Sequence, residues 1–292
     1  MTPRCPESPR LDGKLAVVTG GNAGVGIEIA RGLARRGAEV IVAARTASTA
    51  AAACERIARE TDAKATHAAL DLSDLESVVG ASQRIREIAG GRPVDVLVAN
   101  AGVWPREYAT SKQGHEIAFA TNTLGHHLLV RRMLEDGLLR ATRVVVLTGD
   151  IYVRVRDCTS DFRYEGSSGG ALAYCRSKLG NLWFAAELQR RHPELFVVSV
   201  HPGVIDSGLT GKAEGLEAAM KKRFLLDVEG GAQTPLFCAT QPGLERGGYY
   251  HNTLGRVRLP RGDAAADEAK AKALWARLEE LSAPYRAASA AA

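Results

Sequence analysis

Short runs of β-branched and apolar residues alternate with longer segments of helical spacing through most of the chain. The apolar runs are residues 15–19, 39–44, 66–70, 94–99, 143–148 and 196–201, and the helical segments are 25–36, 47–59, 74–89, 114–134 and 171–191. This alternation is typical of repeated βαβ units, whose parallel strands are covered by helices on both faces. The sequence therefore predicts an α/β protein built on one doubly wound parallel sheet.

No internal repeat or low-complexity linker divides the 292 residues, so we predict a single domain over residues 13–282. A polar, proline-rich extension (1–12) and a tail of small residues (283–292) are expected to be flexible. A further strand is predicted near 248–250 and an amphipathic helix over 263–281. Because ligands bind outside the carboxyl ends of such strands, the long segments 150–170 and 204–229 are expected to form the walls of a substrate pocket.

Composition excludes several classes of protein. Hydrophobic residues make up 46% and charged residues 24% of the chain, the balance of a folded globular protein. The net charge is only +5 and the basic residues form short, separate clusters, so we expect no nucleic-acid partner. With no membrane-length apolar run and no signal-like start, a cytoplasmic protein is expected. The five cysteines lack paired spacing, so we expect free thiols and neither a disulfide framework nor a metal site.

A glycine-rich segment, Thr19-Gly20-Gly21-Asn22-Ala23-Gly24-Val25-Gly26, follows the first predicted strand and leads into a helix. Such glycines let the backbone approach a pyrophosphate, and the helix offers unpaired N–H groups and the positive end of its dipole. The alternative is a strand-to-helix turn whose glycines serve packing. Arg45 ends the second strand, where an acid favours NAD and an arginine accommodates the 2′-phosphate of NADP. We therefore predict NADP(H), the alternative for Arg45 being a solvated loop charge.

Together with further motifs, this pattern resembles the short-chain dehydrogenase/reductase family over roughly residues 13–260. The motifs are Asp71-Leu72, Asn100-Ala101-Gly102, Asn122, Tyr174-x-x-x-Lys178 and Pro202-Gly203. Residues 172–179 and 201–203 look most like the retinol-dehydrogenase and oxidoreductase branch, which reduces bulky apolar carbonyls. The resemblance implies a Rossmann-type domain, NADP(H) as cofactor, a small carbonyl substrate, and dimers or tetramers formed through helices equivalent to residues 114–134 and 171–191.

Tyr174 and Lys178 stand four residues apart and share one helix face, so the ammonium can lower the pKa of the phenol. Tyr174 can then donate a proton to a carbonyl oxygen as hydride arrives from the nicotinamide. The resemblance implies that Lys178 also bonds the nicotinamide ribose and that Asn122 holds a water that relays protons to Lys178. The alternatives are a core tyrosine with a snorkelling lysine, and an asparagine that satisfies a buried helix.

The resemblance also implies contacts along the whole cofactor. Asp71 would bond the adenine, the alternative being a helix cap before Asp74. Asn100, Ala101 and Gly102 would line the adenosine and its ribose, while Ser207 and its neighbours would hold the nicotinamide. The predicted cofactor-binding set is Gly20, Asn22, Gly24, Val25, Gly26, Arg45, Asp71, Leu72, Asn100, Ala101, Gly102, Tyr174, Lys178, Pro202, Gly203, Ile205 and Ser207.

Residue 149 departs from the family pattern. The family ends its fifth strand with two serines, of which the second bonds the substrate carbonyl, whereas this chain has Thr148-Gly149-Asp150. Thr148 should point to the other face unless the strand shifts by one residue, and Asp150 has the wrong charge for an oxyanion. Losing such a donor costs about 10² to 10³ in rate. A water, Thr148 after a register slip, Ser167 or Ser168, or a substrate hydroxyl are the candidate replacements.

These features predict an NADPH-dependent reductase of a ketone or aldehyde on a bulky apolar or aromatic molecule. The alanine- and arginine-heavy composition is associated with GC-rich bacteria, in which such enzymes often tailor secondary metabolites. Gly149 keeps two alternatives open: an NADP(H)-binding protein with other chemistry, such as cyclisation, epimerisation or dehydration, and one that binds the cofactor without turnover. The candidate aromatic walls of the pocket are Trp104, Tyr108, Phe162, Tyr164, Trp183 and Phe224.

Overall fold

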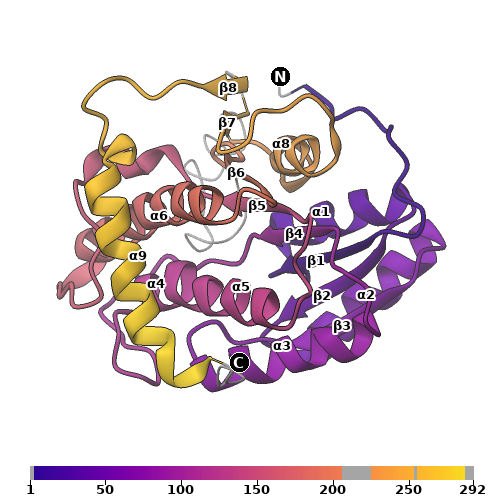
Figure 1. Cartoon of the computed structure of the whole chain (residues 1–292), viewed down its shortest axis with the longest axis horizontal. Coiled ribbons are helices and arrows are strands. Elements are labelled where there is room, and N and C mark those ends of the chain that lie inside the picture. The colour runs from indigo at the N-terminus through magenta and orange to yellow at the C-terminus, as the bar shows by residue number, and fades with distance from the viewer. Residues whose placement is uncertain (1–2, 206–224, 253–254, 287–292) are drawn as a thin grey trace, which may run out of the picture.

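The computed structural model describes residues 3–205, 225–252 and 255–286, and its centre is one eight-stranded sheet in the order β3-β2-β1-β4-β5-β6-β7-β8 (Figure 1). All neighbouring pairs are parallel except β7 and β8. This order confirms the predicted doubly wound α/β fold. The strands are β1 (Leu15–Thr19), β2 (Glu39–Ala44), β3 (Ala65–Ala69), β4 (Val96–Ala99), β5 (Arg143–Leu147), β6 (Phe196–His201), β7 (Tyr249–His251) and β8 (Gly255–Val257).

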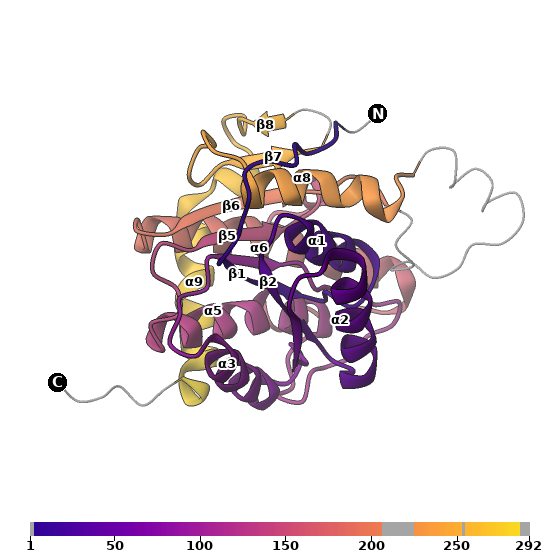
Figure 2. The same cartoon turned by 90° about the vertical axis from the view of Figure 1, so that its right-hand side faces the viewer.

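Helices cover both faces of the sheet, which explains why β1, β4 and most of β5 are continuous apolar runs (Figures 1 and 2). Helices α1 (Gly24–Arg35), α2 (Ala47–Thr61) and α8 (Val228–Thr240) bury their apolar residues in the core on one face. Helices α3 (Leu75–Ala89), α5 (Gly125–Glu135), α6 (Gly166–Arg191) and α9 (Glu268–Ser282) contribute to the core on the other.

The predicted helix over residues 114–134 is interrupted. It consists of the short α4 (Ile117–Phe119), a π-helical turn (Ala120–Leu124) and α5. The Glu116 carboxylate caps α4 by accepting hydrogen bonds from the N–H groups of Ala118 and Phe119. Single π turns inside helices occur frequently at functional sites, and this one contains Asn122.

Helix α8 was not predicted, because its sequence carries Gly230, Gly231 and Pro235, residues with low helix propensity. The helix begins at an Asp227 cap, whose carboxylate accepts a hydrogen bond from Gly230 N–H at 2.7 Å. Tertiary packing stabilises the helix further, since α8 lies against α1 and the sheet. Short 3₁₀ turns, also absent from the prediction, occur at Asp150–Arg154, Ala264–Ala266 and Ala283–Tyr285.

The described part of the N-terminal extension packs against α8 before the chain enters β1, as Figure 2 shows. Cys5 is buried, and its N–H donates to the Gln233 side chain at 2.9 Å. The Gln241 amide donates to the Ser8 carbonyl at 2.6 Å. Through these contacts, residues 5 and 8 of the extension lie against α8 and its C-terminal end. Among the helices of the described residues, none has the length and apolarity needed to cross a membrane.

Candidate active site

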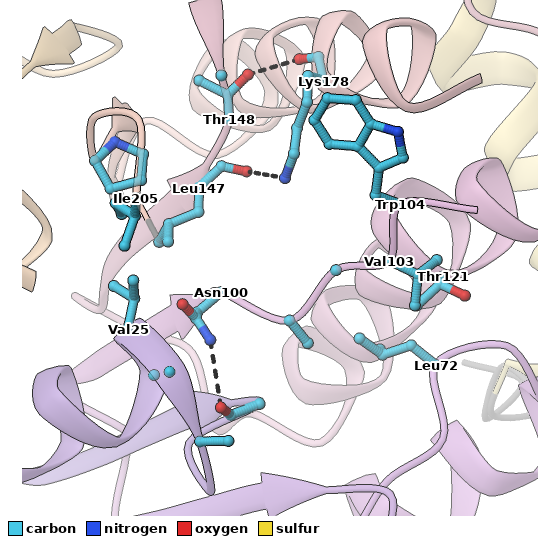
Figure 3. A pocket seen from close by; sticks show the side chains of 18 of the residues that line it. Val25, Leu72, Asn100, Val103, Trp104, Thr121, Leu147, Thr148, Lys178 and Ile205 are labelled. Carbon is cyan, nitrogen blue, oxygen red and sulfur yellow. Dashed lines mark hydrogen bonds between the residues drawn. The ribbon is translucent and has the colours of Figure 1, made fainter. Parts of the chain in front are cut away.

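A cavity of about 790 Å³ opens at the carboxyl ends of β1, β2, β4, β5 and β6 (Figure 3). Every predicted cofactor-contacting residue in the described ranges lines it, and Ser207 lies outside those ranges. The cavity therefore brings together residues that come from six separate stretches of the sequence.

The glycine segment forms one end of this cavity. Gly20 and Gly24 have φ values of +64° and +54°, in the left-handed region that favours glycine. A Cβ on Gly26 would lie 2.1 Å from the Gly20 carbonyl oxygen, so that position has no room for a side chain. Ala23 precedes α1 without a side-chain cap, which leaves the first-turn N–H groups of the helix available to an anion. The segment has the shape and polarity that a pyrophosphate requires.

Asp71 and Arg45 lie beside that end. The Asp71 carboxylate accepts hydrogen bonds from Ser73 N–H at 2.9 Å and from the Ser73 hydroxyl at 2.6 Å, so it orders the turn after β3. Capping of α3 belongs to Asp74, which accepts from Glu76 N–H at 3.0 Å. Arg45 is exposed at the end of β2 and lines the cavity. Asp71 thus lines the cavity without serving as the helix cap.

Tyr174 and Lys178 enter the other end of the cavity from α6. Lys178 is 4% exposed, and its ammonium donates to the Leu147 carbonyl at 3.4 Å (Figure 3). Burial lowers the pKa of Lys178 to about 8. The Lys178 nitrogen lies 5.2 Å from the centroid of the Tyr174 ring. The expected lowering of the Tyr174 pKa is wrong for this structure, because burial raises the pKa of Tyr174 above its ordinary value.

Asn122 lies fully buried behind these two residues and does not line the cavity. Its amide oxygen accepts from Val103 N–H at 2.8 Å, and its amide nitrogen donates to the Val103 carbonyl at 3.0 Å and to the Ser177 hydroxyl at 2.8 Å. The side chain therefore ties the segment after β4 to the helix that carries Tyr174 and Lys178. Its role in a proton relay stays a prediction.

His126 is a residue that the sequence analysis missed. Burial lowers its pKa to about 4, so the ring is neutral at ordinary pH. Its Nδ1–H donates to the Asn122 carbonyl at 3.0 Å, and its Nε2 lies 2.9 Å from the Thr19 hydroxyl, from which it accepts. The same hydroxyl oxygen accepts from Asn100 N–H and Ala101 N–H. His126 thus links the π turn to the glycine end of the cavity. No local motif marks this role, because Thr19 and His126 are 107 residues apart in the sequence.

Gly149 has an extended backbone, with φ −163° and ψ 140°, so its conformation does not require glycine. A Cβ there would lie 3.7 Å from Lys178 Cγ and 3.9 Å from His201 Nδ1, which are ordinary contact distances. The register slip considered for Thr148 is not observed, because β5 pairs regularly with β6. Thr148 lines the cavity, and its hydroxyl donates to the Lys178 carbonyl at 2.7 Å (Figure 3). Ser167 and Ser168 are exposed and lie outside the cavity.

The expected aromatic pocket is wrong in most of its members. Trp104 lines the cavity and stacks on Tyr174, with ring centroids 4.3 Å apart and an interplanar angle of 17°. Trp183 is a core residue whose indole N–H donates to the Ala264 carbonyl at 2.9 Å. Phe224 lies outside the described residues. The remaining three pack with one another away from the cavity: Tyr108, Phe162 and Tyr164.

Comparisons with known proteins agree with this geometry. A family model described as short chain dehydrogenase matches residues 14–217. The WW domain-containing oxidoreductase of Gallus gallus is 36% identical over 288 residues, covering 93% of this chain and 68% of that protein. Retinol dehydrogenase 12 of Mus musculus is 34% identical over 282 residues, covering 93% of this chain and 87% of that protein.

Two solved structures extend the likeness. An uncharacterized protein from Mycobacterium paratuberculosis is 33% identical with a TM-score of 0.73, covering 94% of this chain and 95% of that one. A short chain dehydrogenase from Burkholderia cenocepacia, crystallised in complex with NADP, is 25% identical with a TM-score of 0.66, covering 83% of this chain and 97% of that one. The family match spans more than half of the sequence, and the chain belongs to the short chain dehydrogenase family.

Proposed function

We propose that the chain is an NADPH-dependent reductase of a ketone or aldehyde on a bulky apolar or aromatic molecule, acting in secondary metabolism. The observation that carries this proposal is the cavity itself, which joins the glycine segment and Arg45 at one end to Tyr174 and Lys178 at the other. Bound NADPH would supply the hydride. The glycine segment would hold its pyrophosphate, and Arg45 its 2′-phosphate.

Tyr174 is suited to donate the proton that accompanies hydride transfer. Because burial raises its pKa, the phenol stays protonated at neutral pH, as a general acid must. The Lys178 ammonium beside the ring favours the phenolate that remains after the proton has left. Trp104, stacked on Tyr174, offers a flat apolar surface beside the phenol ring. These contacts favour a carbonyl carried on a large apolar substrate.

The Tyr174→Phe variant tests this role. We expect NADPH consumption with a panel of bulky ketones and aldehydes to fall by about 10² to 10⁴, because the acid is removed, while NADPH binding persists. Following NADPH absorbance gives the rate, and NADPH fluorescence gives the affinity. Tyr108→Phe is the matched control, since Tyr108 lies outside the cavity. A Tyr174→Phe enzyme that keeps wild-type rates would contradict the proposal.

The cofactor preference is tested at Arg45. Replacing Arg45 by alanine removes the cation expected at the 2′-phosphate, so the affinity for NADPH should fall about tenfold while that for NADH changes little. Arg59→Ala is the control, because Arg59 is equally exposed on the neighbouring helix α2 but does not line the cavity. An unchanged ratio of the two affinities would overturn the assignment.

Gly149 favours a second candidate function, in which the protein binds NADP(H) but catalyses a different reaction through Tyr174 or has no turnover. The missing hydroxyl removes a donor that stabilises the oxyanion of a reduced carbonyl. This second function predicts that the protein binds NADPH but does not oxidise it with any compound of the panel. It also predicts that Gly149→Ser does not restore NADPH oxidation.

A further inference from the structure

A cluster of three metal-ligating side chains stands beside Gly149 and has no part in the chemistry described above. Asp150 is the first residue of the 3₁₀ turn that follows β5, while His201 and His251 are the last residues of β6 and β7 and pair in register. One ligand atom from each of these side chains lies within 4.8 Å of the other two. Three neighbouring strand ends therefore aim two imidazoles and a carboxylate at one point.

The separations are close to those of an ion site. Asp150 Oδ2 lies 2.6 Å from His251 Nε2 and 3.8 Å from His201 Nε2. Ligand atoms bound to a common zinc ion at about 2.0–2.2 Å lie about 3.3 Å apart in tetrahedral geometry. The first of these separations would open and the second would close, each by less than about 1 Å. The third separation, between the two imidazoles, lies within 4.8 Å and would close by up to about 1.5 Å.

We propose that Asp150, His201 and His251 bind a divalent transition-metal ion of the zinc type. Two histidines and one carboxylate are the ligand set of metal sites that keep an open coordination position. The phenol of Tyr249 donates to the other oxygen of Asp150, the kind of outer hydrogen bond that orients a ligating carboxylate. Binding through His201 Nε2 places the ring proton on Nδ1 and gives up the long hydrogen bond, 3.4 Å, that Nδ1 accepts from Asp150 N–H.

Two of the three proposed ligands lie at the edge of the cavity that holds Tyr174 and Lys178. Asp150 and His201 line the cavity, and a Cβ on Gly149 would lie 3.9 Å from His201 Nδ1. An ion held here would meet a carbonyl oxygen near the place where the family has its serine, and would polarise it as a Lewis acid. This catalytic role rests on the proposed reductase function, whereas the binding of the ion does not.

The spacing of the three ligands explains why the sequence did not indicate the site. Asp150, His201 and His251 are each about fifty residues apart in the chain, and no local motif joins them. The five cysteines have no paired spacing in the sequence, and all five are buried free thiols. Only the parallel order of β5, β6 and β7 brings the ligands together.

To test the site, the whole chain without an affinity tag is treated with a chelator and titrated with ZnCl₂ by calorimetry. A second titration with CoCl₂ records the visible d–d absorption of the bound cobalt. We expect one ion per chain and a cobalt spectrum of low coordination number. His251→Ala removes a ligand that does not line the cavity, so its affinity for zinc should fall at least about tenfold. His67→Ala, on β3 at the opposite edge of the sheet, is the matched control and should bind zinc like the wild type.

Absence of stoichiometric binding, or equal binding by wild type and His251→Ala, would overturn the site. Circular dichroism checks that the variant is folded. If it is not, Asp150→Asn is titrated in its place and should show the same loss. Turnover of a reducible ketone should fall after chelation and return when zinc is added. Turnover that is the same with and without zinc would overturn the Lewis-acid role but not the binding site. If no ketone is reduced, the reductase proposal fails and the titration still decides the site.

Discussion

Gly26 and Gly149 line the same cavity at opposite ends, but only one of them has to be glycine. A Cβ on Gly26 would lie 2.1 Å from the Gly20 carbonyl oxygen, a distance that real contacts do not reach. A Cβ on Gly149 would find its nearest neighbour, Lys178 Cγ, at 3.7 Å. Backbone packing therefore dictates the first glycine, whereas none of the described residues around Gly149 dictates the second.

The two ends of the cavity differ in the same way: the main chain constrains one end, and side chains determine the other. At the glycine end, positive φ angles and close backbone contacts restrict the residue types, so the shape of this end is built into the main chain. At the Gly149 end, the chemistry depends on side chains that the fold tolerates but does not require. A serine at residue 149 would therefore change the chemistry of this end without a change in the backbone.

The largest expected effect comes from restoring that serine. In chelator-treated protein, Gly149→Ser should raise kcat for a bulky ketone by about 10² to 10³, because it supplies a hydroxyl donor to the developing oxyanion. The free energy of unfolding should change by less than about 0.5 kcal/mol, since the site is extended and open. Steady-state kinetics and urea unfolding give the two values. A large loss of stability would show that residue 149 is glycine for steric reasons, and an unchanged kcat would show that the missing hydroxyl does not limit the rate.

Features that depend on neighbouring residues could be predicted from the sequence, whereas features that depend on distant partners could not. The bounds of β1, β2 and β6 and the place of the glycine segment between β1 and α1 were predicted correctly, because strand patterning and turn chemistry are local. His126 and the Asp150, His201 and His251 cluster were not predicted, since their partners are distant in sequence. Most of the aromatic wall was misplaced for a related reason: position near a pocket loop does not tell which way a side chain points.

A smaller effect, at the glycine end, should follow from Gly26→Ala. The added methyl group must displace the Gly20 carbonyl or part α1 from β1, so we expect the free energy of unfolding to fall by about 2–3 kcal/mol. NADPH binding should weaken with it, because the loop that would hold the pyrophosphate is displaced. Gly80→Ala is the matched control: Gly80 is exposed in α3 with no atom near a Cβ, so alanine should stabilise by about 0.5–1 kcal/mol. Equal unfolding midpoints for the two variants would contradict the steric argument.

The smallest expected effect comes from the charge at the Gly149 end. Lys178 is buried with its pKa lowered to about 8, so above that pH the folded protein loses a proton that the unfolded chain keeps until about 10.5. Because the unfolded state then binds more protons, the free energy of unfolding rises with pH in this window. Below pH 8 the ammonium is charged in both states, and burial of that charge destabilises the fold.

The measurement is urea unfolding from pH 7 to 10 for wild type and Lys178→Met. Between pH 8 and 10 the wild type should gain about 2 kcal/mol relative to the variant, which lacks the titrating group. Lys14→Met is the control, because Lys14 is exposed beside Asp95 at the opposite end of the strands and should leave the wild-type pH dependence nearly intact. Parallel curves for wild type and Lys178→Met would show that the Leu147 carbonyl and its surroundings already offset the cost of burying the ammonium. The Gly149 end would then carry no more electrostatic cost than the glycine end, where Arg45 is exposed to solvent.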